Sequence, residues 1–218
     1  MKNMPSIRHY PDFDCFCRLA KDADLVPVYR RLVSDSLTPV TAFHKIDAGR
    51  CAFLAESVIG GEKVGRYSFL ATHPFLEIEA YDDSVTVNSY SGTSASGAPI
   101  LRTRQFSSPD PLGELRQRVE AIRAATLPEL PPFCGGAVGY AGYDTVRYVE
   151  DLPNPPPDDR HAPDMSFAFY DQMVVFDNIT KTMVVVVMAR CDSPDGDLQD
   201  AYDKAARRVD GLVEELIE

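Results

Sequence analysis

The stretch Cys51–Thr72 reads CAFLAESVIGGEKVGRYSFLAT. Its first apolar run ends in the polar pair Glu56–Ser57, and a second apolar run follows Arg66. The intervening Ile59–Glu62 reads IGGE, and paired glycines between two apolar runs indicate a turn. The sequence therefore predicts a β-hairpin that carries polar side chains near its turn.

Strand patterns dominate the chain, and the hairpin is followed by further predicted strands. A meander of antiparallel strands is predicted at residues 51–57, 67–72, 75–81 and 85–90, and a later hairpin at 165–176 and 182–189. Amphipathic helices are predicted at residues 12–23, from Thr38, from Asp110 and from about Asp197. The predicted fold class is α+β, with largely antiparallel sheets and flanking helices.

Composition excludes several classes of function. The chain has 218 residues with 44% hydrophobic and 25% charged content, which favours one large domain over two small ones. A net charge of −11 opposes binding to nucleic acid or to an anionic membrane surface. The apolar run at Met183–Ala189 is too short to span a bilayer. The first ten residues, MKNMPSIRHY, lack the apolar segment of a secretory signal.

The cysteines and histidines give no sign of a disulfide framework or a metal site. Five cysteines, an odd number, are irregularly spaced. Four scattered histidines do not complete a ligand set with them. The sequence therefore predicts a cytoplasmic protein in a reducing compartment.

The polar residues of the first hairpin suit a small zwitterionic ligand. Arg66 can offer a fork of donors to a carboxylate, and Glu56 can accept from an ammonium group. Ser57, Tyr67 and Ser68 add two hydroxyls and a phenol. A plainer interpretation is an ion pair between Glu56 and Arg66 across the hairpin.

Ser57 is a poor candidate for a hydrolytic nucleophile. No histidine follows it at a spacing that indicates a base, and the Gly-x-Ser-x-Gly pattern is absent. A serine in this position most often makes a local backbone hydrogen bond.

A second stretch, Gly135–Pro153, reads GGAVGYAGYDTVRYVEDLP. It lacks both the G-x-G-x-x-G order and the Lys-Ser/Thr ending of nucleotide-binding loops. Its glycines are expected to let strands pack closely, with Tyr140 and Tyr143 filling the space beside them.

These two stretches, in this order, resemble the amino-terminal region of anthranilate synthase component I. With the pattern between them, the resemblance covers about Leu25 to Arg190. It implies that residues 1–218 form the regulatory, tryptophan-binding region of that fold. It also implies that Ser57 contacts the inhibitor L-tryptophan, with Glu56, Arg66, Tyr67 and Ser68 at or beside the site.

The resemblance further implies an enzyme that converts chorismate and glutamine-derived ammonia to anthranilate and pyruvate with Mg²⁺. A glutamine amidotransferase subunit, component II, would supply the ammonia. The family's catalytic residues and Mg²⁺ ligands belong to a carboxy-terminal chorismate-binding half, which nothing after Arg190 resembles. We therefore expect no catalytic residue or metal ligand in this chain, no activity from it alone, and truncation rather than a free-standing remnant.

Two alternatives remain open. Aminodeoxychorismate synthase component I, of the folate pathway, shares the same layout, although the complete hairpin and GYDTVRY favour anthranilate synthase. The other alternative is a stand-alone, non-catalytic module that binds an amino acid or docks another subunit.

Overall fold

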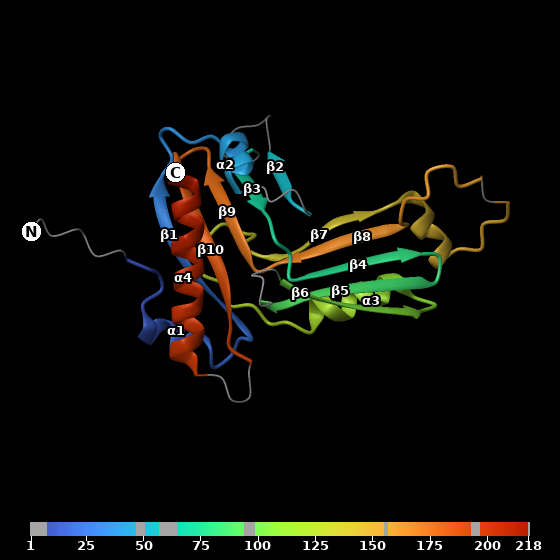
Figure 1. The fold of residues 1–218 in the computed structure, drawn as a ribbon, viewed down its shortest axis with the longest axis horizontal. Coiled ribbons are helices and arrows are strands. Elements are labelled where there is room, and N and C mark those ends of the chain that lie inside the picture. Colours follow the sequence, from blue (N-terminus) through green and yellow to red (C-terminus); the bar gives the residue numbers. More distant parts are fainter. Residues whose placement is uncertain are drawn as a thin grey trace, which may run out of the picture. The chain divides into compact units, whose positions relative to one another are not determined.

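The computed structural model describes residues 8–46, 51–56, 65–93, 99–154, 157–192 and 197–217 (Figure 1). Contacts between residues divide the chain into two compact units. The first unit comprises residues 1–73, 122–135 and 171–218, and the second comprises 74–121 and 136–170. Each unit has its own five-stranded antiparallel sheet. The predicted α+β class with largely antiparallel sheets is confirmed, and it is organised as two units where the sequence favoured one.

The sheet of the first unit has the strand order β1-β10-β9-β3-β2. The strands are β1 (Leu25–Val33), β10 (Thr182–Arg190), β9 (Gln172–Asp177), β3 (Tyr67–Ala71) and β2 (Phe53–Glu56). The antiparallel pairing of β2 with β3 runs from Phe53 opposite Ala71 to Glu56 opposite Ser68. The predicted early hairpin is therefore confirmed, with β2 at the edge of the sheet.

The described part of the first unit contains the helices α1 (Phe13–Leu19), α2 (Pro39–Ile46) and α4 (Leu198–Ile217). The side chain of Asp12 accepts the backbone N–H of Cys15 at the start of α1. The Thr38 hydroxyl accepts the N–H of Thr41 at the start of α2 (3.1 Å). Both predicted helix starts are confirmed, because the capping oxygens satisfy N–H groups that lack a partner within the helix.

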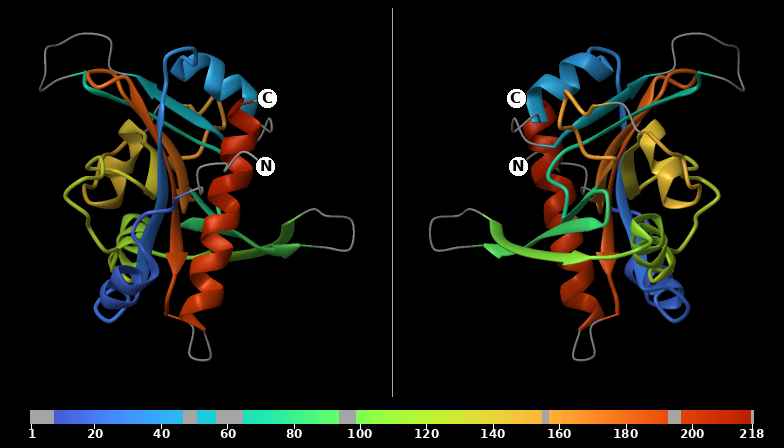
Figure 2. Two further views of the ribbon diagram at one scale, coloured as in Figure 1. Left: turned by 90° about the vertical axis from the view of Figure 1, so that its left-hand side faces the viewer. Right: turned by 90° about the vertical axis from the view of Figure 1, so that its right-hand side faces the viewer.

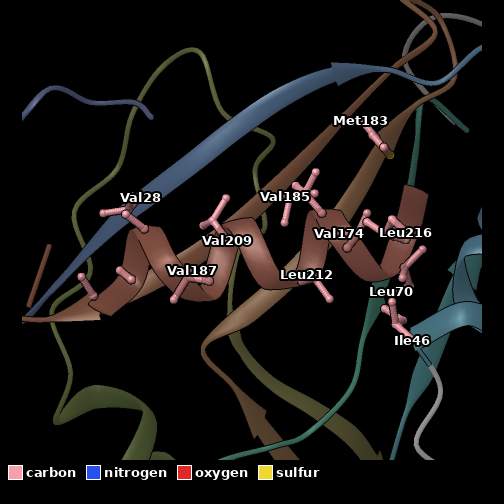
Figure 3. Close-up of a cluster of buried hydrophobic side chains, with 14 of the residues drawn as sticks. Val28, Ile46, Leu70, Val174, Met183, Val185, Val187, Val209, Leu212 and Leu216 are labelled. Carbon is pink, nitrogen blue, oxygen red and sulfur yellow. The ribbon is translucent and has the colours of Figure 1, made fainter. Parts of the chain in front are cut away.

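The core of the first unit forms where the long helix α4 packs on β10 and β1 (Figure 2). Figure 3 shows side chains from the helix and the sheet meeting there; among them are Leu70, Val174, Val185, Val209 and Leu216. The four consecutive valines of β10, Val184–Val187, are all buried. Consecutive buried residues alternate between the two faces of a strand, so β10 is covered on both faces.

The sheet of the second unit has the order β6-β5-β4-β8-β7. Its strands are β4 (Leu76–Tyr81), β5 (Ser84–Thr93), β6 (Pro99–Ser107), β7 (Gly136–Ala141) and β8 (Met165–Tyr170). Helix α3 (Pro111–Glu120) begins after Asp110, whose side chain accepts the N–H of Gly113 (2.8 Å). A 3₁₀ helix at Tyr143–Tyr148 follows β7. The buried core contains Ile78, Ala80, Val85, Val87, Met165 and Phe169.

Three predictions about this fold need correction. The early strands are not one meander, because β2 and β3 lie in one sheet while β4 and β5 lie in the other. The predicted strand at 165–176 is two strands, β8 and β9, which belong to different units and are separated by Asp171. Tyr140 and Tyr143 were expected to fill space beside glycines, yet both are exposed. Apolar patterns identify strands but not their distant partners.

No helix within the described residues has both the length and the apolar character needed to cross a bilayer.

Candidate functional site

The structure places four of the five predicted site residues around the β2–β3 hairpin. Glu56 ends β2 and lies opposite Ser68 of β3. Arg66 directly precedes β3, and Tyr67 is the first residue of β3. Ser57 falls within residues 57–64, outside the described residues, so its predicted contact with a ligand stays a prediction.

The Arg66 guanidinium is held by a residue that the sequence analysis did not consider. Its Nε and Nη2 both donate to Oδ2 of Asp177, at 3.1 and 2.7 Å. The guanidinium carbon also lies 4.9 Å from the centre of the Tyr67 ring, a cation–π distance. The plainer interpretation of a Glu56–Arg66 ion pair is therefore wrong, because Arg66 pairs with Asp177 of β9.

Asp177 is a buried carboxylate with partners on both oxygens. Its side chain is 7% exposed, and Oδ1 accepts the N–H groups of Ile179 and Thr180 (3.0 and 3.2 Å). Burial by itself raises the pKa of this carboxyl, but hydrogen bonds from Arg66, Thr180 and Ile179 outweigh it and lower the pKa to about 2. Asp177 is therefore an anion that fixes both the β9–β10 turn and Arg66.

Asn178 ties the same turn to the start of β3. Its backbone N–H donates to the carbonyl of Arg66 (2.8 Å). Its side-chain Nδ2 donates to Oγ of Ser68 (3.1 Å), a residue that is 1% exposed. Sequence reasoning treated residues 177–181 only as a hairpin connection. In the sequence, a carboxylate and an amide side chain, Asp177 and Asn178, come at the end of a strongly apolar strand. That pattern was the available sign that the turn has a structural role.

The pH dependence of folding should report on Asp177. A carboxyl pKa lowered from 3.8 to about 2 stabilises the folded state above the unfolded pKa, and that contribution is lost as pH falls through the folded pKa. We expect wild-type protein to lose roughly 2 kcal/mol of unfolding free energy from this group between about pH 4 and pH 2. Asp177→Asn should lose correspondingly less. Urea titrations of both proteins at several pH values measure the difference.

A second carboxyl with a lowered pKa does not affect the comparison of wild type with Asp177→Asn. Hydrogen bonds from Arg123 lower the pKa of Asp24 to about 2, but Asp24 is present in both proteins and cancels in the difference. Parallel pH profiles for wild type and Asp177→Asn would contradict the assignment of a charged, hydrogen-bonded Asp177.

A cavity of about 860 Å³ lies in the second unit, between the β4–β5 turn, the 3₁₀ helix and residues 157–164. Several of its carboxylates already have partners within the protein. Oδ2 of Asp164 accepts the N–H of Asp82 (2.7 Å) and the hydroxyl of Tyr148 (3.0 Å). Asp144 pairs with Arg147 (2.9 Å). The four predicted site residues that the structure describes do not line this cavity, and its acidic groups serve mainly to hold loops.

Among the residues that the structure describes, no group of three or more His, Cys, Asp and Glu side chains could hold a metal ion. The Arg66 guanidinium, held by Asp177 and 41% exposed, is the group beside the β2–β3 hairpin that could donate hydrogen bonds to a carboxylate. Glu56 is exposed at the end of β2, whereas Ser68 is buried and its hydroxyl accepts a hydrogen bond from Asn178.

Sequence comparison finds relatives along nearly the whole chain, although no family model matches it. Anthranilate synthase component 1 of Acetivibrio thermocellus is 33% identical over 209 residues, which cover 96% of this chain and 40% of that protein. The Synechocystis protein of the same name is 36% identical over 210 residues, with 94% and 39% covered. Anthranilate synthase alpha subunit 2, chloroplastic, of Arabidopsis thaliana is 34% identical over 236 residues, with 99% and 37% covered.

Structural comparison supports the same fold. The crystal structure of anthranilate synthase component I from Streptococcus pneumoniae matches with a TM-score of 0.52 and 24% identity, covering 87% of this chain and 37% of that one. The chain spans about two fifths of the length of the curated relatives it matches. Over nearly its whole length, this chain is therefore a homologue of part of anthranilate synthase component I.

Proposed function

We propose that this chain is the feedback-regulatory part of an anthranilate synthase component I and carries much of its L-tryptophan site. Homology supports the family. The observation that carries the site is Arg66, whose side chain is anchored by a buried carboxylate yet stays 41% exposed. An anchored but accessible guanidinium is suited to binding the carboxylate of a free amino acid.

Each residue of the hairpin has a chemical part in this proposal. Arg66 donates hydrogen bonds to the tryptophan carboxylate, and Glu56 accepts from its ammonium group. Ser57 contacts the ligand, while Tyr67 and Ser68 shape the site beside Arg66. Tyr67 also restrains Arg66 by stacking.

Catalysis is assigned to parts outside this chain. The complete enzyme would convert chorismate and ammonia to anthranilate and pyruvate, and a component II amidotransferase would release the ammonia from glutamine. In the resembled family the Mg²⁺ ligands belong to the chorismate-binding half, and this proposal places them there. Tryptophan would act by favouring one packing of the regulatory and catalytic parts, with a coupling free energy of about 1–3 kcal/mol. A cytoplasmic location stays a prediction.

Ser57→Arg tests the assignment of the site. In an enzyme that joins this chain to the chorismate-binding half, the substitution should place bulk and positive charge where tryptophan binds. We expect the tryptophan concentration for half-inhibition to rise by roughly 100-fold, near the upper end of typical allosteric coupling. Rates of anthranilate formation with and without tryptophan measure it. Unchanged inhibition in an active variant would show that Ser57 is wrongly assigned.

A titration of the 218-residue chain with L-tryptophan separates this proposal from a stand-alone sensor. We expect weak or absent heat of binding, because in the resembled family the catalytic half completes the site. Micromolar binding by the chain alone would instead favour a self-contained module. An assay of the complete enzyme for anthranilate against aminodeoxychorismate distinguishes the folate-pathway relative, which the names of the relatives above do not support.

A further inference from the structure

The turn between β9 and β10 is fastened to the beginning of β3 by side-chain and backbone hydrogen bonds. We propose that Asp177 and Asn178 are positioning residues: Asp177 orients Arg66 for the amino-acid ligand, and Asn178 fixes the buried Ser68 beside it. This role rests on the function proposed above. The proposal adds the β9–β10 turn, which is distant in sequence, to a site otherwise formed by the β2–β3 hairpin.

Asp177 occupies one edge of the Arg66 guanidinium and leaves another free. A guanidinium has five N–H donors in a planar fork. Asp177 accepts from the edge formed by Nε and Nη2, so the edge formed by Nη1 and Nη2 is the one left for a ligand carboxylate. Because Tyr67 stacks against the guanidinium, the plane of the fork is restrained as well as its direction.

Asp177 is itself rigidly placed. It lies opposite Tyr67 of β3 on one side and Thr182 of β10 on the other, within three paired strands. Its Oδ1 is held by two backbone N–H groups of the turn. A side chain fixed on both oxygens can hold the long arginine side chain in one arrangement, which reduces the ordering required when ligand binds.

Asn178 in turn holds Ser68. The amide nitrogen of Asn178 donates to Oγ of Ser68 (3.1 Å), which therefore acts as the acceptor. The Ser68 hydroxyl hydrogen is then the group directed to another acceptor. The backbone N–H of Asn178 also holds the Arg66 carbonyl (2.8 Å), so one residue constrains both neighbours of Tyr67.

Asp177→Asn in an enzyme containing both this chain and the chorismate-binding half tests the proposal. Asparagine keeps an acceptor for the turn but places an N–H₂ group where Arg66 needs an acceptor. We expect the L-tryptophan concentration for half-inhibition to rise by roughly tenfold. In an Arg66→Met background, which offers Asp177 no donor, the same change should raise it by less than about twofold, because the interaction is already lost. Equal rises in both backgrounds overturn the proposal.

The control is a matched ion pair elsewhere in the first unit. Arg208 donates to both oxygens of Asp171 (2.9 and 2.6 Å), and its side chain is 42% exposed, close to the value for Arg66. Asp171→Asn should leave tryptophan inhibition unchanged. If Asp177→Asn fails to fold, Asn178→Ala replaces it, with an expected rise of roughly threefold. No rise with Asn178→Ala overturns the proposal.

A ligand-free measurement separates this inference from the proposed function. In the 218-residue chain, the Arg66 Nε–H should exchange with solvent slowly, and Asp177→Asn should speed its exchange by at least about tenfold. Fast exchange in the wild-type chain overturns the positioning role whatever tryptophan does. A wild-type enzyme that tryptophan does not inhibit overturns the proposed function and this inference together, whereas equal rises in the double-variant test overturn the inference alone.

Discussion

Gly139→Ala is expected to unfold the second unit under conditions in which the wild type is folded. Gly139 of β7 lies directly opposite Phe167 of β8. A Cβ at this position would collide with the carbonyl oxygen of Ser166 and lie 2.6 Å from Cα of Phe167. Both atoms are backbone, so relief requires the two strands to separate. We expect a loss of about 3 kcal/mol or more in unfolding free energy.

Urea denaturation followed by circular dichroism measures this loss, and Gly211→Ala is its control. Gly211 lies inside α4, and apart from its chain neighbours and the backbone of its own helix no heavy atom lies within 4 Å of where its Cβ would be. An alanine there should stabilise the protein by about 0.5–1 kcal/mol, because glycine is a poor residue in a helix interior. A Gly139→Ala protein as stable as wild type would mean that β7 and β8 are not paired in this register.

Leu216→Ala should have the second large effect, in the core of the first unit. Leu216 is 1% exposed near the end of α4, and Figure 3 shows it beside Leu70 of β3 and Ile46 of α2. Removing its branched end costs transfer free energy and leaves a cavity, together about 2–5 kcal/mol. The urea midpoint should fall while the denaturant slope stays the same.

The neighbouring Ile217 is the control for that experiment. Ile217 is 69% exposed, so Ile217→Ala should change unfolding free energy by less than about 0.5 kcal/mol. Equal losses from the two substitutions would contradict the face of α4 that the structure buries.

The spacing of apolar residues predicted those elements in which the local sequence alone shows which side chains are buried. The stripe of α4 and the consecutive valines of β10 are examples, since each pattern alone specifies what the element buries. The sequence analysis did not predict β6. Residues Pro99–Arg104 are all exposed, so this strand lacks the alternation of apolar and polar residues by which a strand is recognised. The division at Asp171 was missed because Met165–Phe176 is apolar on both sides of it.

The candidate site shows the same limit. Glu56, Arg66, Tyr67 and Ser68 are close in sequence, so a hairpin prediction brought them together. Asp177 lies 111 residues beyond Arg66, and no spacing rule joins them. Only the pairing of β3 with β9 places Asp177 opposite Tyr67 and shows why Arg66 does not need Glu56 as its partner.

The outer edge of β1 has a consequence for how the protein behaves in concentrated solution. Leu25 exchanges backbone hydrogen bonds with Arg123 and Ala125, and Tyr29 does so with Tyr10. Between them Pro27 has no N–H to offer. From Leu25 to Tyr29, alternate positions on this edge are thus already paired or lack a donor, which disfavours the addition of a strand from another molecule there.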